Sequence, residues 1–140
     1  MLEKFTQINF IAVLVAGLVS FFLGAIWYMP LFGTLWVRLH GLTDEQVKQR
    51  QARMNPGVFF GGMIVSYLFV AFAMAFLLLP LNATRWYDGI IIACVIWLIV
   101  AACALTAQLA SDRHYGIYAI DVGFYFVFLN FMGVLLVMWP

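Results

Sequence analysis

The first apolar stretch, residues 8–29, limits the fold of this chain more than any other feature of its sequence. It contains no acidic or basic residue, and a helix of this length can cross a bilayer core of about 30 Å. The strands of a membrane β-barrel alternate between apolar and polar residues, whereas this stretch is continuously apolar. Three further stretches of similar length and apolar character follow, at residues 57–79, 89–108 and 117–139.

The composition supports the same interpretation. Of the 140 residues, 66% are hydrophobic and 9% are charged, and no soluble domain of this size can bury that much apolar surface. Backbone groups in lipid must bond within the protein, which leaves helices or closed barrels. We therefore expect an all-α integral membrane protein in which residues 1–140 form one domain, a bundle of four transmembrane helices. The formal net charge of +1 gives no attraction to nucleic acid, so no such partner is expected.

Basic residues predict the orientation. Connections 30–56 and 109–116 hold five of them, and the rest of the chain outside the spans holds two, Lys4 and Arg85. Because basic connections stay in the cytoplasm, these two connections are expected there and both termini on the other side. The bilayer is then a partner, since a basic residue near an anionic surface contributes about 1 kcal/mol. The residues expected to contact lipid headgroups are Arg38, Lys48, Arg50, Arg53 and Arg113.

Segment 30–56 is the only sizeable connection, and its sequence predicts two short elements. Residues 31–40 carry apolar side chains around Arg38, which suits an interfacial elbow at the depth of the lipid headgroups. Gly41 ends this elbow. Thr43 and Gln46 have the spacing of a capping box, which predicts a helix over residues 44–54.

Small residues recur where helices would meet. In the first span one stands at every fourth position from residue 12 to residue 24, a pattern that lets two helix backbones approach closely in lipid. This small-residue ladder could join two copies of the chain into a homo-oligomer, or it could join the first span to the fourth within one copy. The predicted helix-packing residues are Ala12, Ala16, Ser20, Gly24, Gly62, Ser66, Gly123 and Gly133.

Asp121 is the only acidic or basic residue within the four apolar stretches. A carboxylate in a membrane span is costly unless it is paired, protonated or in contact with water, so it is a candidate for function. Tyr125 lies one helical turn further on, and Asn130 lies deeper; together they complete a candidate intramembrane polar site. Alternatively, Asp121 is a structural anchor that reaches headgroup water or pairs with a basic residue. The basic candidates are Arg38, His40, Arg113 and His114.

The sequence offers no pattern typical of catalysis. A Gly-rich phosphate loop, a cluster of metal-ligand residues and a Ser-His-Asp set are all missing from it. Cys94 and Cys103 are nine residues apart in one span, which places them on opposite faces of a helix. We therefore expect no enzyme activity, no cofactor and no metal site.

Two motifs flank the first connection: residues 24–36 read GAIWYMPLFGTLW, and residues 41–45 read GLTDE. They resemble motifs of a bacterial family of four-span membrane proteins of unknown function, DUF1761. The first resembles the exit of that family's first span, and the second resembles the start of its short helix. Residues 118–124, YAIDVGF, resemble a run in its last span, where Asp121 stands at a position that is often Asn. The resemblance implies a bacterial inner-membrane protein with four spans, and with the orientation above its termini are periplasmic. It implies no activity.

Two functions remain open at the level of sequence. The leading hypothesis is a structural or interaction protein, an oligomeric scaffold of the inner membrane. The alternative is a small transporter or channel for protons, cations or a small solute, with Asp121 in the pathway. The environment of Asp121 discriminates between them, because an anchor would be held by a salt bridge and a transport site would face a hydrated cavity.

Overall fold

The computed structural model describes residues 7–139 and confirms the all-α membrane class. Four helical segments are long and apolar enough to cross a membrane, and the described residues contain no strand. The predicted interfacial elbow and short cytoplasmic helix follow the first of them. Lys4, which entered the charge count above, lies outside the described residues. The elements in order are α2 (Phe10–Ile26), η1 (Trp27–Leu31), α3 (Gly33–Leu39), α4 (Asp44–Arg53), α5 (Pro56–Leu78), η2 (Leu79–Leu81), α6 (Trp86–Ala110) and α7 (Tyr115–Met138).

Side-chain caps fix where several helices begin. The Asn9 side chain accepts two backbone N–H groups of the first turn of α2, each at 3.1 Å. Thr43 and Gln46 form the predicted capping box, which starts α4 at residue 44. Asn55 caps α5, and Pro56 stands at the first helical position, where its missing N–H costs nothing. These caps satisfy backbone donors that the helices leave unpaired.

The first span ends in a π-helical turn around Pro30. Proline has no N–H to donate and its ring crowds the preceding turn, so the backbone widens there. The Phe32 N–H donates to the Trp27 carbonyl, five residues earlier, at 2.9 Å. A Cβ atom on Gly33 would lie 2.7 Å from the Tyr28 carbonyl oxygen, so the tight exit into α3 requires glycine.

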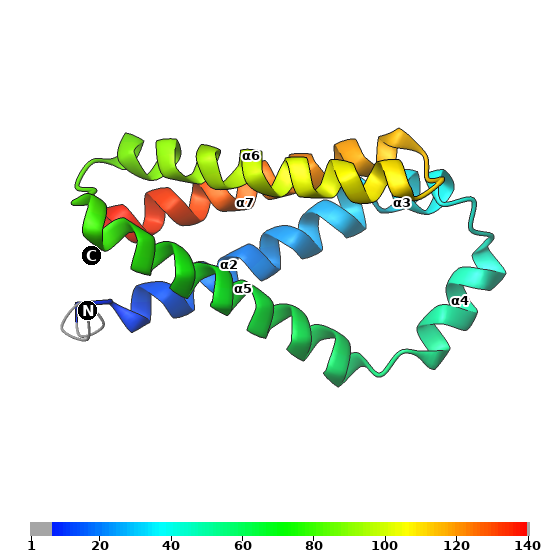
Figure 1. Cartoon of the computed structure of the whole chain (residues 1–140). Coiled ribbons are helices and arrows are strands. Elements are labelled where there is room, and N and C mark those ends of the chain that lie inside the picture. The colour runs from blue at the N-terminus through cyan, green and yellow to red at the C-terminus, as the bar shows by residue number, and fades with distance from the viewer. Residues whose placement is uncertain (1–6, 140) are drawn as a thin grey trace.

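Helix α7 is the centre of the bundle. It packs along α6 and also contacts α2, and Figure 1 shows α6 and α7 side by side. Helix α5 crosses α2 and then diverges from it towards α4 (Figure 1). At the crossing, a Cβ atom on Gly17 would lie 3.1 Å from the Leu68 Cα atom. The largest fully buried side chains of α7 are Ile117, Phe124, Leu129 and Met132.

The small-residue ladder of the first span is used inside the chain. Ala12, Ala16, Ser20 and Gly24 are all buried between α2 and its neighbours. A Cβ atom on Gly24 would lie 3.1 Å from the Phe124 ring of α7. Of the two alternatives, the structure therefore has the contact within one copy, and a homo-oligomer packed through this face is incompatible with it because the side chains are already covered.

The other predicted packing residues have different surroundings. Gly62 is exposed on α5, and a Cβ atom there would meet nothing within 4 Å. The Ser66 hydroxyl bonds back to the Gly62 carbonyl of its own helix. Within one copy this pair is therefore not a contact between helices. Gly133, in contrast, lies directly against α6.

The closest approach of two backbones joins α6 and α7. A Cβ atom on Gly89 would lie 2.4 Å from the Gly133 carbonyl oxygen, and one on Gly133 would lie 2.5 Å from the Gly89 carbonyl oxygen. Both residues are buried. Gly89 is not among the predicted helix-packing residues, and it stands at the edge of the expected third span.

Replacing Gly89 by Ala is expected to destabilise the fold by about 1–3 kcal/mol, because backbone atoms of α7 occupy the space of the added methyl group. Gly62→Ala is the matched control. Its methyl group enters open space, and Ala favours the helix, so stability should stay the same or rise by up to about 1 kcal/mol. Reversible unfolding in mixed micelles, followed by circular dichroism, measures both. Equal losses for the two variants would show that the crossing does not limit stability.

Candidate functional site

Asp121 meets a hydroxyl group from the end of the first span. The Tyr28 hydroxyl, on the π-helical turn, donates to the Asp121 Oδ1 atom at 2.7 Å. Asp121 is half-buried and lies six residues after the first residue of α7, about 9 Å along the helix axis. This contact joins the first and last spans near the end of the bundle that carries α3.

Two tryptophan residues hold the backbone of α7 on either side of Asp121. The Trp27 Nε1–H donates to the Ile120 carbonyl at 3.2 Å, and the Trp97 Nε1–H donates to the Val122 carbonyl at 2.9 Å. One tryptophan comes from η1 and the other from α6, so the segment around Asp121 is fixed from two directions. An indole N–H in lipid needs an acceptor, and this need was the signal that could have pointed to both residues.

Two further tyrosine residues complete a group of oxygen atoms. Tyr125 follows Asp121 by one turn of α7, so the two residues share one face of that helix. Tyr67, on α5, packs edge-to-face on Phe124 and Phe128. Tyr125 contacts the same two rings. We call Tyr28, Tyr67, Asp121 and Tyr125 the polar cluster. Its members come from three spans that are far apart in the sequence.

Phe124 forms the apolar side of the polar cluster. Its side chain is 1% exposed. Its ring packs edge-to-face on Tyr28 and Tyr67, with centroid distances of 5.3 and 6.3 Å. It also packs on Trp27 at 6.0 Å. These aromatic contacts keep the cluster in a low-dielectric environment, where each hydrogen bond is stronger than in water.

The third residue of the predicted polar site lies elsewhere. The Asn130 side chain donates to the Phe126 carbonyl of its own helix at 2.8 Å and faces the Cys94 sulfur of α6 at 3.6 Å. The predicted set is therefore divided, with Tyr125 beside Asp121 and Asn130 on the side of α7 that contacts α6. Tyr28 was not predicted, because a tyrosine near the end of a span is also typical of an interfacial anchor. Tyr67 was not predicted either, since it lies mid-span in α5 among apolar residues without a local polar pattern.

The basic residues that could have paired with Asp121 have other surroundings. The His40 Nδ1 atom is within hydrogen-bond distance of the Trp36 carbonyl oxygen, at 2.8 Å. The Arg113 Nε–H donates to the Ser111 hydroxyl at 2.9 Å. His114 accepts the backbone N–H of Gly116. Arg38 is exposed, as are the other residues expected to contact lipid headgroups, which are Lys48, Arg50, Arg53 and Arg113. Among residues 7–139, the recorded partner of Asp121 is a hydroxyl group.

The comparison with known families covers nearly the whole chain. Residues 11–137 match the family described as "Protein of unknown function (DUF1761)". The chain belongs to this family. The match confirms the family suggested by the sequence motifs, and it includes all four residues of the polar cluster. No curated protein and no solved structure matches the chain.

In this DUF1761 protein, Tyr28→Phe and Asp121→Ala are expected to be energetically coupled by about 0.6–2 kcal/mol, since either substitution removes the same hydrogen bond. A double-mutant cycle of unfolding in mixed micelles measures the coupling. Tyr115→Phe serves as the control, because Tyr115 is exposed at the start of α7. Its effect should add to that of Asp121→Ala within about 0.5 kcal/mol. A coupling below that value for Tyr28 would contradict the role of the bond.

Proposed function

We propose that this protein is a small transporter or channel that moves protons or small cations, with Asp121 as the group that takes them up. The observation that carries the proposal is the partner of Asp121, a tyrosine hydroxyl rather than a basic side chain. A basic partner would neutralise the carboxylate permanently. A hydroxyl partner leaves its charge available for exchange, and an acidic residue retained inside a span is a functional candidate.

The Tyr28–Asp121 pair can exist in two protonation states without losing its hydrogen bond. When the carboxylate is ionised, the hydroxyl donates to it. When the carboxyl group is protonated, it can donate and the hydroxyl oxygen can accept. Tyr67 and Tyr125, whose rings both contact Phe124, add two hydroxyl groups that can bind a proton carrier or the shell of a small cation. This chemistry changes no covalent bond of a substrate, so we propose transport without enzymatic catalysis.

The proposal also includes a cellular location and an orientation in the membrane. We infer that the protein resides in the inner membrane of a bacterium, with α3 and α4 in the cytoplasm and the termini in the periplasm. The exposed basic residues at that end support this orientation, because basic connections are retained on the cytoplasmic side. The same residues would contact anionic headgroups there. Asp121 would then lie near the cytoplasmic entrance of the pathway.

Ion flux through proteoliposomes tests the proposal directly. The protein should conduct protons or a monovalent cation, and Asp121→Asn should abolish the flux because the amide cannot take up the charge. Tyr28→Phe should reduce the flux by about tenfold, the equivalent of one hydrogen bond of about 1.4 kcal/mol. Asp112→Asn is the matched control, an acid-to-amide change in the exposed turn between α6 and α7, and it should leave the flux unchanged.

Two results would contradict the proposal. One is the absence of flux in a wild-type protein shown to be folded and inserted. The other is an equal reduction by Asp121→Asn and Asp112→Asn, which would indicate a general effect of charge. Solid-supported membrane recordings with single ions supplied in turn distinguish protons from other cations.

One observation favours a second candidate, a homo-oligomeric scaffold. The first half of α5 is exposed, with Val58 and Val65 exposed by 72% and 64%. Added Cβ atoms on Gly61 and Gly62 would meet nothing within 4 Å. Small residues of this kind allow a helix from a second copy to approach closely in lipid. This face would remain available after the small-residue ladder of α2 is covered.

The Gly62→Leu variant tests whether copies of the protein associate through α5. If copies meet through α5, the added side chain should raise the dissociation constant of the oligomer in lipid by at least about fivefold, since overpacking costs about 1 kcal/mol or more. Ala102→Leu, on the exposed face of α6, is the control and should have no such effect. Subunit counting by photobleaching in nanodiscs of increasing size measures both. A particle that is monomeric at all densities would rule out this candidate.

A further inference from the structure

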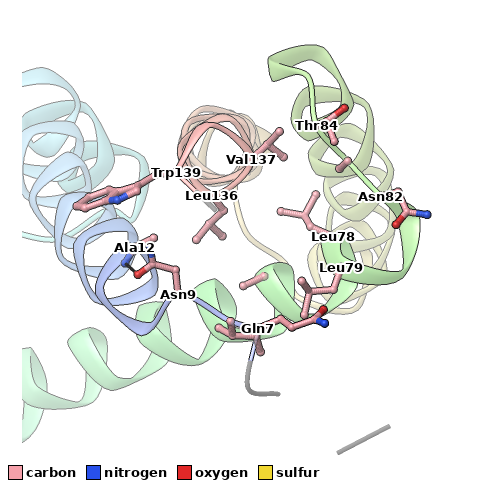
Figure 2. A pocket seen from close by; sticks show the side chains of 13 residues that line it. Gln7, Asn9, Ala12, Leu78, Leu79, Asn82, Thr84, Leu136, Val137 and Trp139 are labelled. Atoms are coloured by element: carbon pink, nitrogen blue, oxygen red, sulfur yellow. Dashed lines mark hydrogen bonds between the residues drawn. The ribbon is translucent and has the colours of Figure 1, made fainter. Parts of the chain in front are cut away.

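A cavity of about 270 Å³ lies at the end of the bundle where α2 begins and α7 ends. Figure 2 shows that its walls come from the start of α2, the end of α5 with the loop that follows, and the end of α7. Asp121 and the wall residue Leu136 are fifteen residues apart, about 22 Å along α7. The cavity is therefore separate from the polar cluster and plays no part in the transport proposal.

The floor of the cavity is apolar. Leu78 and Leu136 line it from α5 and α7, and both side chains are buried. Ala12 and Ala75 face the same space from α2 and α5, and their single methyl groups leave it open. A space walled by hydrocarbon favours the body of an apolar ligand over water.

The rim of the cavity is polar but uncharged. Asn82 and Thr84 line this rim, and Figure 2 shows both residues on the loop at the edge of the cavity. Of the described residues that line the cavity, none carries a charge. Asn82 has a left-handed φ of 48°, a conformation that Asn tolerates well.

Hydrogen bonds to Asp88, in the first turn of α6, fix the loop that carries this rim. The Asp88 carboxylate accepts the backbone N–H groups of Thr84 and Arg85 at 3.2 and 3.0 Å. A rim fixed before a ligand arrives loses little conformational entropy when the ligand binds. The arrangement therefore has the properties of a binding site: an apolar floor, a few polar groups and a fixed entrance.

We propose that this cavity binds an uncharged amphiphile, with its hydrocarbon body on the floor and one hydroxyl or amide group at the rim. An apolar cavity of about 150 Å³ in another protein accepts benzene, so a volume of 270 Å³ suits a substituted phenol or a medium-chain alcohol. A carboxylate or ammonium group would lose its hydration here without meeting an opposite charge among the lining residues that the structure describes. The cavity thus selects neutral molecules over charged ones of the same length.

Photolabelling in lipid nanodiscs tests the site. The probe is a medium-chain alkanol with a diazirine group, and mass spectrometry locates the labelled peptides. Labelling should be saturable and should map to the peptides that contain Leu78 and Leu136. At neutral pH and equal concentrations in the membrane, n-octanol should compete at least about tenfold better than octanoate, because the carboxylate must be desolvated.

Matched variants separate the cavity from the surrounding lipid surface. Ala75→Leu fills the cavity and should reduce labelling at least about tenfold, whereas Ala73→Leu, exposed on the same helix, should leave it unchanged. Thr84→Val removes the hydroxyl group, and Asn82→Gly removes the amide while keeping the left-handed turn. Both should weaken labelling by several-fold, and they decide the question if Ala75→Leu fails to fold.

Three outcomes would overturn the proposal. Labelling that does not saturate, or that persists in a folded Ala75→Leu variant, would show that the alkanol only dissolves in the surrounding lipid. Equal competition by octanoate would show that the rim does not select uncharged groups. Ion flux is not part of the readout, so failure here leaves the transport proposal untouched, and the reverse also holds.

Discussion

Lipid offers no hydrogen bonds, and the arrangement of the helices around α7 follows from this constraint. Polar groups of the spans must find partners within the protein, and many of those partners lie on α7. Trp27 and Trp97 donate to its backbone carbonyls, and Tyr28 donates to its one carboxylate. Tyr118 in turn donates from α7 to the Ala101 carbonyl of α6 at 3.1 Å. These bonds define the rotation of α7 against α2 and α6, which apolar packing alone would specify weakly.

The parts of the fold that depend on neighbouring residues could be predicted from the sequence. The four spans follow from the length of the apolar stretches, and α4 follows from Thr43 and Gln46. The faces on which helices meet could not be derived in the same way, because the spans are apolar on nearly every side and lack a period that separates core from lipid. Gly89 illustrates this limit, since only the three-dimensional crossing shows that its backbone touches Gly133.

The candidate site, too, could be predicted from the sequence only in part. Asp121 stands out in the sequence because an acidic residue inside a span is costly. Its partner Tyr28 is 93 residues away, and the sequence contains no local signal that pairs them. Tyr28 at the exit of the first span is equally typical of an interfacial belt, so the polar cluster emerges only when α2, α5 and α7 are placed together. The cavity at the opposite end likewise results from the convergence of three segments.

The π-helical turn connects α3 to the first span. Tyr28 belongs to that turn, and its carbonyl oxygen lies 2.7 Å from the position of a Cβ atom on Gly33, so α3 begins close to the residue that bonds Asp121. The Phe32 N–H holds the same turn closed through the Trp27 carbonyl. A movement of α3 about Gly33 therefore also moves the Tyr28 hydroxyl relative to the carboxylate. Because π-helical turns often lie at functional sites, this geometry links the position of α3 to the hydrogen bond between Tyr28 and Asp121.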